Sequence, residues 1–176
     1  MVSRSAKPDP VAPPPRRWLI VMGAAGAGKS TIAAALAERL CADYLDADDF
    51  HPPDNVAKMR RGEPLSDADR APWLDVLHEV LATHVAEKRS LVLACSALRE
   101  AYRRRLRAGL DGVELVYLRA PREVLAARLA DRADHFFPAA LLDSQLAALE
   151  EPSDGLVVDA TLPIERIVAL AAAARG

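Results

Sequence analysis

One eight-residue segment, Gly23-Ala24-Ala25-Gly26-Ala27-Gly28-Lys29-Ser30, constrains the fold of this chain more than any other. It follows an apolar run, Trp18–Met22, and precedes a segment with helical spacing, Thr31–Leu40. Glycines allow successive backbone N–H groups to converge on an anion, and the N-terminus of the following helix adds a partial positive charge. The sequence therefore predicts a phosphate-binding loop, in preference to a plain Gly/Ala-rich turn between a strand and a helix.

Individual residues of this loop have separate expected roles. Lys29 is expected to reach the outer phosphates of a nucleotide and to act in catalysis, and Ser30 is expected to supply a hydroxyl ligand to Mg²⁺. The residues expected to bind the nucleotide are Gly23, Ala24, Ala25, Gly26, Ala27, Gly28, Lys29, Ser30 and Thr31.

Length and composition limit the remaining possibilities. A chain of 176 residues that is 51% hydrophobic can bury one core, and a second domain would be cramped. The net charge of −2, without a basic stripe, gives no reason to expect a nucleic-acid partner, and no apolar run approaches the roughly 20 residues that span a bilayer. Two cysteines, Cys41 and Cys95, without a Cys-x-x-Cys pair or a secretory leader, suit a reducing cytoplasm. We expect a soluble cytoplasmic protein with a small substrate.

The first 17 residues differ from the rest of the chain. They include five prolines and carry a local charge of +3. Prolines oppose the amphipathic helix of a mitochondrial-type presequence, so we expect a disordered tail over residues 1–17 and a single domain over residues 18–176.

Apolar runs typical of strands alternate with helical patterns along the domain, which predicts an α/β fold with a parallel sheet. Asp67 is expected to cap the helix that contains Trp73, and Gly109 is expected to end an arginine-rich helix. Because ligands gather at the carboxyl ends of parallel strands, the site is expected just after those strands. The strands are predicted at Trp18–Met22, Tyr44–Asp46, Leu91–Ala94, Val113–Leu118 and Leu156–Val158.

Polar side chains follow the second predicted strand. Asp48 is the candidate general base for an acceptor hydroxyl, and Asp46 is either the alternative base or a ligand of Mg²⁺ through water. An acidic turn or a helix cap is the structural alternative for both. His51 either contacts the substrate or has a structural role.

Arginines provide the cations that phosphoryl transfer requires. Arg128 and Arg132 lie four residues apart, before an irregular stretch, so both are expected to act in catalysis as a lid over about residues 128–140 closes, unless they belong to a solvated helix face. Arg99, after the third strand, is a candidate partner for a substrate carboxylate. The run Arg103–Arg107 is interpreted as a solvated face.

Several further runs occur in a fixed order along the chain: Asp46-Ala47-Asp48 with His51-Pro52, Lys58-Met59, Gly62–Leu65, Asp69–Leu74, Cys95–Leu98, His135–Phe137 and Glu150–Pro152. Together with the loop they resemble the gluconate kinase family, over about residues 18–173. The resemblance implies a P-loop fold like that of nucleoside monophosphate kinases, a three-layer sandwich with a five-stranded parallel sheet and a mobile lid. It also implies transfer of the γ-phosphate of ATP to the 6-hydroxyl of D-gluconate with Mg²⁺, in a cytoplasmic homodimer. The substrate contacts that it implies are Asp46, Asp48, His51, Arg60, Arg99, His135 and Gln145.

Two other interpretations share the loop. A kinase for shikimate, a nucleotide or adenylyl sulfate is one, and the runs Cys95-Ser96-Ala97 and Gly62–Leu65 argue against it. A nucleotide-dependent switch or an ATP-driven binding module is the other. The sequence contains neither the Asn-Lys-x-Asp motif that reads guanine nor the Leu-Ser-Gly-Gly-Gln signature of transporters.

Overall fold

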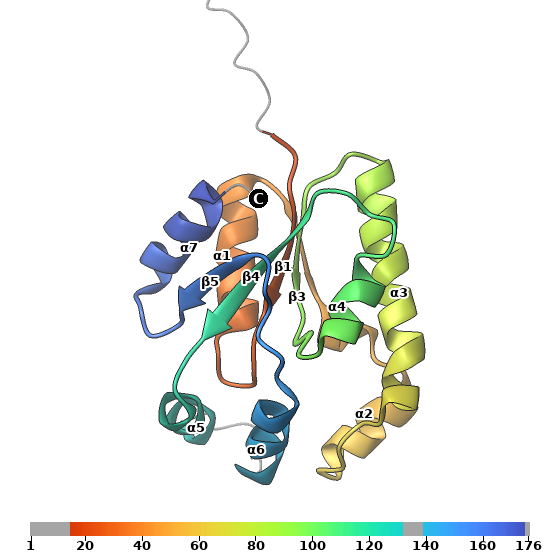
Figure 1. Ribbon diagram of the computed structural model, residues 1–176, viewed down its shortest axis with the longest axis vertical. Helices are drawn as coiled ribbons and strands as arrows, with labels where there is room; N and C mark the ends of the chain where they lie inside the picture. The colour runs from red at the N-terminus through yellow and green to blue at the C-terminus, as the bar shows by residue number, and fades with distance from the viewer. Residues whose placement is uncertain (1–14, 132–138, 175–176) are drawn as a thin grey trace, which may run out of the picture.

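A five-stranded parallel sheet forms the centre of the molecule (Figure 1). The computed structural model describes residues 15–131 and 139–174. Its strands lie in the order β2-β3-β1-β4-β5, which confirms the predicted parallel sheet and its five strands. Their bounds are β1 Trp18–Met22, β2 Asp43–Asp46, β3 Leu91–Ala94, β4 Val113–Arg119 and β5 Leu156–Asp159.

Helices cover both faces of the sheet, so the fold has three layers. In Figure 1, α1 and α7 lie on one face, and α3 and α4 lie on the other. The helices are α1 Lys29–Leu40, α2 Pro53–Arg60, α3 Asp67–Ala86, α4 Glu100–Leu106, α5 Arg122–Ala130, α6 Ala139–Ala148 and α7 Ile164–Ala173, and a 3₁₀ turn, η1, spans Ala47–Phe50. In the described ranges no helix combines the length and the apolar character that crossing a membrane requires.

Strand β1 shows why the central strands are uniformly apolar. Leu19 and Val21 pack with the residues of α1 and α7, whereas Ile20 and Met22 pack with those of α3. All four side chains are fully buried. A parallel strand covered on both faces needs apolar residues at every position, and this explains the unbroken run that precedes the loop.

Helix boundaries are the first difference from the sequence prediction: α1 begins at Lys29 and not at Thr31, and α3 has a different N-cap from the one expected. Ser66, and not Asp67, is the N-cap: its hydroxyl accepts a hydrogen bond from the Asp69 N–H at 3.1 Å. The Asp69 carboxylate in turn accepts one from the Ser66 N–H at 2.8 Å. This reciprocal pair satisfies two backbone donors at once, which explains why the cap lies one residue earlier than expected.

The arginine-rich segment is the second difference, because the interpretation as a solvated face is wrong for Arg103. Its side chain is 1% exposed, and its guanidinium donates to the carbonyls of Ala97 at 3.0 Å and Leu98 at 3.1 Å. Arg104, the next residue, is 72% exposed. Helix α4 also ends at Leu106, so Gly109 lies in the following turn and does not terminate the helix.

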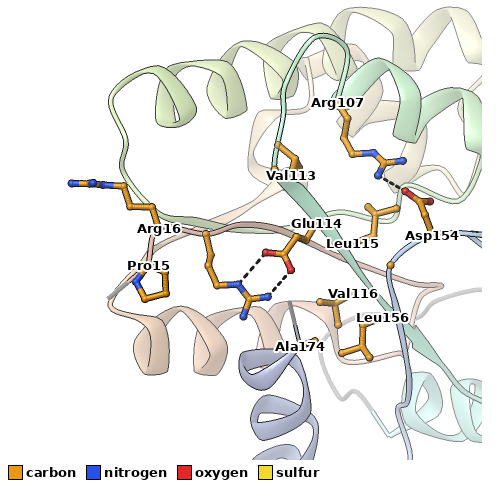
Figure 2. A pocket seen from close by; sticks show the side chains of 13 residues that line it. Pro15, Arg16, Arg107, Val113, Glu114, Leu115, Val116, Asp154, Leu156 and Ala174 are labelled. Carbon is orange, nitrogen blue, oxygen red and sulfur yellow. Dashed lines mark hydrogen bonds and ion pairs between the residues drawn. The ribbon is translucent and has the colours of Figure 1, made fainter. Parts of the chain in front are cut away.

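The described chain extends the domain slightly before its expected start. Arg17 is buried, pairs with Glu114 at 2.7 Å and donates to the carbonyls of Ala171 and Ala172 in α7. Figure 2 shows the pocket of about 720 Å³ beside this contact, at the amino ends of β4 and β5. The phosphate loop lies at the opposite edge of the sheet. Residues 1–14 of the predicted tail lie outside the described residues.

Candidate functional site

The loop Gly23–Ser30 leads from the carboxyl end of β1 into α1. Gly23, Gly26 and Gly28 have φ angles of 151°, 81° and 88°. A Cβ atom at Gly26 would lie 2.7 Å from the carbonyl oxygen of Leu125 in α5. Conformation therefore disfavours a side chain at all three positions, and at Gly23 and Gly26 a backbone carbonyl of another element also leaves no room for one. These are the conditions under which backbone N–H groups can line an anion site.

Two contacts fix the shape of the loop. The Lys29 ammonium donates to the carbonyl of Ala24 at 3.2 Å, so the side chain turns back over the loop. The side-chain oxygen of Gln145, from α6, accepts a hydrogen bond from the Ala25 N–H at 2.7 Å. Gln145 was expected from its motif to contact the sugar acid, and the structure brings it to the phosphate loop. Thr31 lies exposed in the first turn of α1.

Asp46 connects the loop to the end of β2. One of its carboxylate oxygens accepts a hydrogen bond from the Ser30 hydroxyl at 2.6 Å and a longer one from Tyr44 at 3.3 Å. The other accepts the Asp48 N–H at 3.1 Å. A hydroxyl beside a carboxylate is the hard oxygen set that Mg²⁺ prefers, so the residues expected to hold the metal do lie together. Among the described residues, no group of three His, Cys, Asp or Glu side chains is gathered as a metal site of their own.

Asp48 lies in η1, next to Asp46. The indole N–H of Trp73 donates to the carbonyl of Ala47 at 2.7 Å and so holds η1 against α3. Partial removal from water raises the pKa of the Asp48 carboxyl, and the negative charge of Asp46 raises it further. The positive charge of Lys29 lowers it. Because the side chain is 82% exposed, water damps this rise, and the carboxylate remains open to a substrate.

The side chain of His51 is buried beside this carboxylate. Its ring stacks on Trp73 with centroids 4.3 Å apart and an interplanar angle of 12°. The Asn55 amide NH₂ donates to the Asp69 carbonyl at 2.8 Å and lies 3.5 Å from the Nδ1 atom of His51. Since an NH₂ group faces Nδ1, we assign the ring proton to Nε2, which lies 3.9 Å from the Asp48 carboxylate. Burial lowers the pKa of His51, which favours the neutral ring.

A second polar cluster lies where the N-termini of α3 and α4 meet. Arg99 pairs with Asp67 at 3.0 Å, and the Tyr102 hydroxyl also donates to Asp67. The guanidinium carbons of Arg70 and Arg99 lie 5.6 and 5.9 Å from the centre of the Tyr102 ring. We call Asp67, Arg70, Arg99 and Tyr102 the arginine–tyrosine cluster.

The remaining predicted residues are not gathered at these groups. Arg60 is exposed at the end of α2. Arg128 is half-buried, and its guanidinium donates to the carbonyl of Ala160 at 2.8 Å, after β5. Arg132 and His135 lie outside the described residues, as does the middle of the expected lid.

Sequence reasoning missed Asn55 and assigned no role to Arg70 or Tyr102. Asn55 carries no signal of its own, because a single Asn on a short helix is normally a surface residue. Arg70 belongs to the run Asp69–Leu74, which contributed to the family resemblance, so that run was the available indication.

Comparison with known proteins places this geometry in a family. The profile of AAA_33, described as an AAA domain, matches residues 19–152. A gluconokinase of Gluconobacter oxydans is 49% identical over 138 residues, which cover 78% of this chain and 78% of that protein. The chain belongs to the gluconokinase family. A thermoresistant gluconokinase of Escherichia coli is 40% identical and covers 85% of the chain and 88% of its own length.

The three-dimensional comparison agrees with the sequence. The crystal structure of a gluconokinase from Sinorhizobium meliloti superposes with a TM-score of 0.82 at 39% identity, covering 90% of this chain and 91% of that one. The predicted P-loop kinase fold and the predicted family are therefore confirmed, and this member of the gluconokinase family is a kinase.

Proposed function

We propose that the chain transfers the γ-phosphoryl group of ATP to the 6-hydroxyl of D-gluconate, giving 6-phospho-D-gluconate and ADP. Family membership supports the reaction class and the substrate. The observation that carries the residue assignment is the continuous path from Ser30 through Asp46 to Asp48, which puts an open carboxylate beside the phosphate loop. Donor and acceptor groups are thereby set next to each other, as an in-line transfer requires.

On the nucleotide side, the residues fit a triphosphate with magnesium. Backbone N–H groups of the loop bind phosphate oxygens, and that of Ala25 can do so once Gln145 releases it. Lys29 leaves the Ala24 carbonyl to spread charge away from the transferred group. Ser30 would be a direct ligand of Mg²⁺ and Asp46 would hold the ion through water, since the two side chains already lie within hydrogen-bond distance of each other. When bound, the ion neutralises charge on the phosphate oxygens.

On the acceptor side, Asp48 is the better candidate for the base. Both oxygens of Asp46 already accept hydrogen bonds, from Ser30 and from the Asp48 N–H. Exposure leaves the Asp48 carboxylate available, while partial removal from water and the neighbouring charge of Asp46 shift its pKa upwards, in the direction that favours a base. Asp48 therefore accepts the proton of the 6-hydroxyl, and the Nε2–H of His51 faces the same place and orients the hydroxyl.

The arginines and the lid stay proposals from sequence position. Arg128 must release the carbonyl of Ala160 before it can reach a nucleotide. Arg132 is assigned to the nucleotide, and Arg60 and His135 to the substrate.

We further propose a cytoplasmic homodimer. Size-exclusion chromatography with light scattering would test the dimer. A monomeric mass across micromolar concentrations would argue against it.

The test is ADP release by the purified full chain with ATP and Mg²⁺ and a panel of acceptors. The panel contains gluconate, related sugar acids, shikimate and nucleoside monophosphates. We expect gluconate to give the highest kcat/KM, and ³¹P and ¹³C NMR to place the phosphate on C6. Turnover with shikimate or a nucleotide in place of gluconate would overturn the proposal, and turnover that needs a protein partner would favour a nucleotide-dependent switch.

A further inference from the structure

The arginine–tyrosine cluster has more positive than negative charge and an open face. It holds two guanidinium groups against the single carboxylate of Asp67. The side chains of Arg70 and Arg99 are 30% and 41% exposed, so neither is sealed inside the core. Such a cluster can take a second carboxylate with charge-assisted hydrogen bonds.

Arg70 is the member of the cluster whose position and available donors suit the binding of a carboxylate. Its Nη1 atom donates to the Leu65 carbonyl at 2.5 Å and lies 3.4 Å from the Tyr102 hydroxyl, which holds the guanidinium in place. Its distance to Asp67 is 3.9 Å, too long for a hydrogen bond. Within residues 15–131 and 139–174 the hydrogen bonds of Arg70 use Nη1 alone, so the Nε and Nη2 edge donates to no described residue. That edge is the one that binds a carboxylate with two parallel hydrogen bonds.

Helix α3 connects the cluster to the proposed acceptor site. Arg70 precedes Trp73 by three residues on α3, and Trp73 holds both η1 and the ring of His51. The charge of Arg70 contributes to the lowered pKa of His51, so the two groups lie within electrostatic range. Asp48 acts on the same ring from 3.9 Å. A linear substrate can therefore place a hydroxyl at Asp48 and an acid group towards Arg70.

We propose that Arg70 determines specificity by binding the C1 carboxylate of the sugar acid through its Nε and Nη2 edge, with Arg99 as the supporting charge. This inference rests on the proposed function, and it adds a residue that sequence position did not assign. Asp67 is the internal counter-ion of Arg99, and both guanidinium groups lie against the Tyr102 ring.

The test compares Arg70→Gln and Arg70→Lys with the wild type in the full chain. A charge-assisted bidentate contact is worth roughly 10- to 100-fold in binding, so we expect Arg70→Gln to raise the KM for gluconate by that factor. The KM for ATP should stay the same and kcat should change less than about threefold. Arg70→Lys keeps the positive charge but loses the two parallel donors of the guanidinium, so its KM for gluconate should lie between those of wild type and Arg70→Gln.

Arg105→Gln is the matched control, because Arg105 also joins α4 to α3, through Asp75 at 2.6 Å. We expect it to leave both KM values unchanged. A KM for gluconate within threefold of wild type in Arg70→Gln, or a parallel rise in the KM for ATP, would overturn the inference. If Arg70→Gln does not fold, a KM for gluconate in Arg70→Lys that equals the wild-type value would overturn the inference. Absence of gluconate turnover in the wild type would instead refute the proposed function.

Discussion

Replacing Arg103 by Met tests the account of the loop after β3. In the native fold the guanidinium donates to the carbonyls of Ala97 and Leu98 and pairs with Glu100 at 2.9 Å. Methionine fills much of the same volume without a donor, so the substitution isolates the polar contribution. Arg104 provides the control, since it lies one residue further along the same helix and is largely exposed.

The magnitude follows from which groups lose a partner. The Leu98 carbonyl keeps the hydrogen bond from the Glu150 N–H at 2.9 Å, and Glu100 is 41% exposed, so water can solvate it. The Ala97 carbonyl keeps no other bond among the described residues. One buried acceptor without a donor costs about 1–3 kcal/mol, and the lost charge-assisted bonds add roughly 1.5–3 kcal/mol. Allowing for the apolar burial of Met, we expect a loss of about 3 kcal/mol.

The assay is urea unfolding at pH 7, followed by far-ultraviolet circular dichroism and tryptophan fluorescence. Arg103→Met should lower the free energy of unfolding by about 3 kcal/mol at an unchanged m-value, and Arg104→Met by no more than about 0.5 kcal/mol. Equal losses in the two variants, or a loss below about 1 kcal/mol for Arg103→Met, would refute the reasoning.

Three further predictions concern the site and its support. Lys29→Ala should lower kcat by roughly 10²-fold or more with the fold intact, because charge on the transferred group is no longer spread; near-normal turnover in the steady-state assay would contradict this. Asp48→Asn should abolish gluconate phosphorylation while calorimetry still detects ATP binding, and retained turnover would assign the base to Asp46. Lys58 and the Ser66 cap hold the pKa of Asp69 well below its usual range. The stability that this carboxylate contributes is thus present above its unfolded pKa of about 4 and is lost as the pH falls from there towards its lower folded pKa. Urea titrations from pH 7 to 3 should therefore show a weaker pH dependence of the unfolding free energy in Asp69→Asn than in wild type.

The features that sequence could predict are those with a local or periodic signal. The strands β1 and β3 were placed at their observed bounds, and the loop was placed between β1 and α1, although α1 begins at Lys29 and not at Thr31. Glycine conformation and buried apolar runs are properties of short segments, which is why these features could be predicted. Arg103 and Arg104 are the same residue type in the same helix. Arg103 folds back onto the carbonyls of Ala97 and Leu98 directly before α4, whereas Arg104 points to solvent, and residue type alone does not distinguish the two.

The site shows the same limit. Asp48 could be proposed from its place after a strand, but its preference over Asp46 depends on a hydrogen bond from Ser30, which is 16 residues away in the chain. Gln145 could be singled out by motif position, yet its partner, the Ala25 N–H, became evident only when α6 was packed on the loop. Pairings of this kind depend on tertiary contacts, so the sequence indicates the participants and the structure decides the partners.

The proposed acceptor side is supported by α3, and the proposed nucleotide side by other elements. Helix α3 supplies Trp73 to η1 and His51, and it supplies Asp69 to both Asn55 and Lys58 of α2. The phosphate loop instead contacts α5 and α6, on the other side of the carboxyl edge in Figure 1. Changes to the acceptor specificity can therefore accumulate in α2 and α3 while the loop keeps its shape. Substitutions there should change the KM for the sugar acid independently of the KM for ATP, whereas substitutions that shift α5 or α6 should affect ATP first.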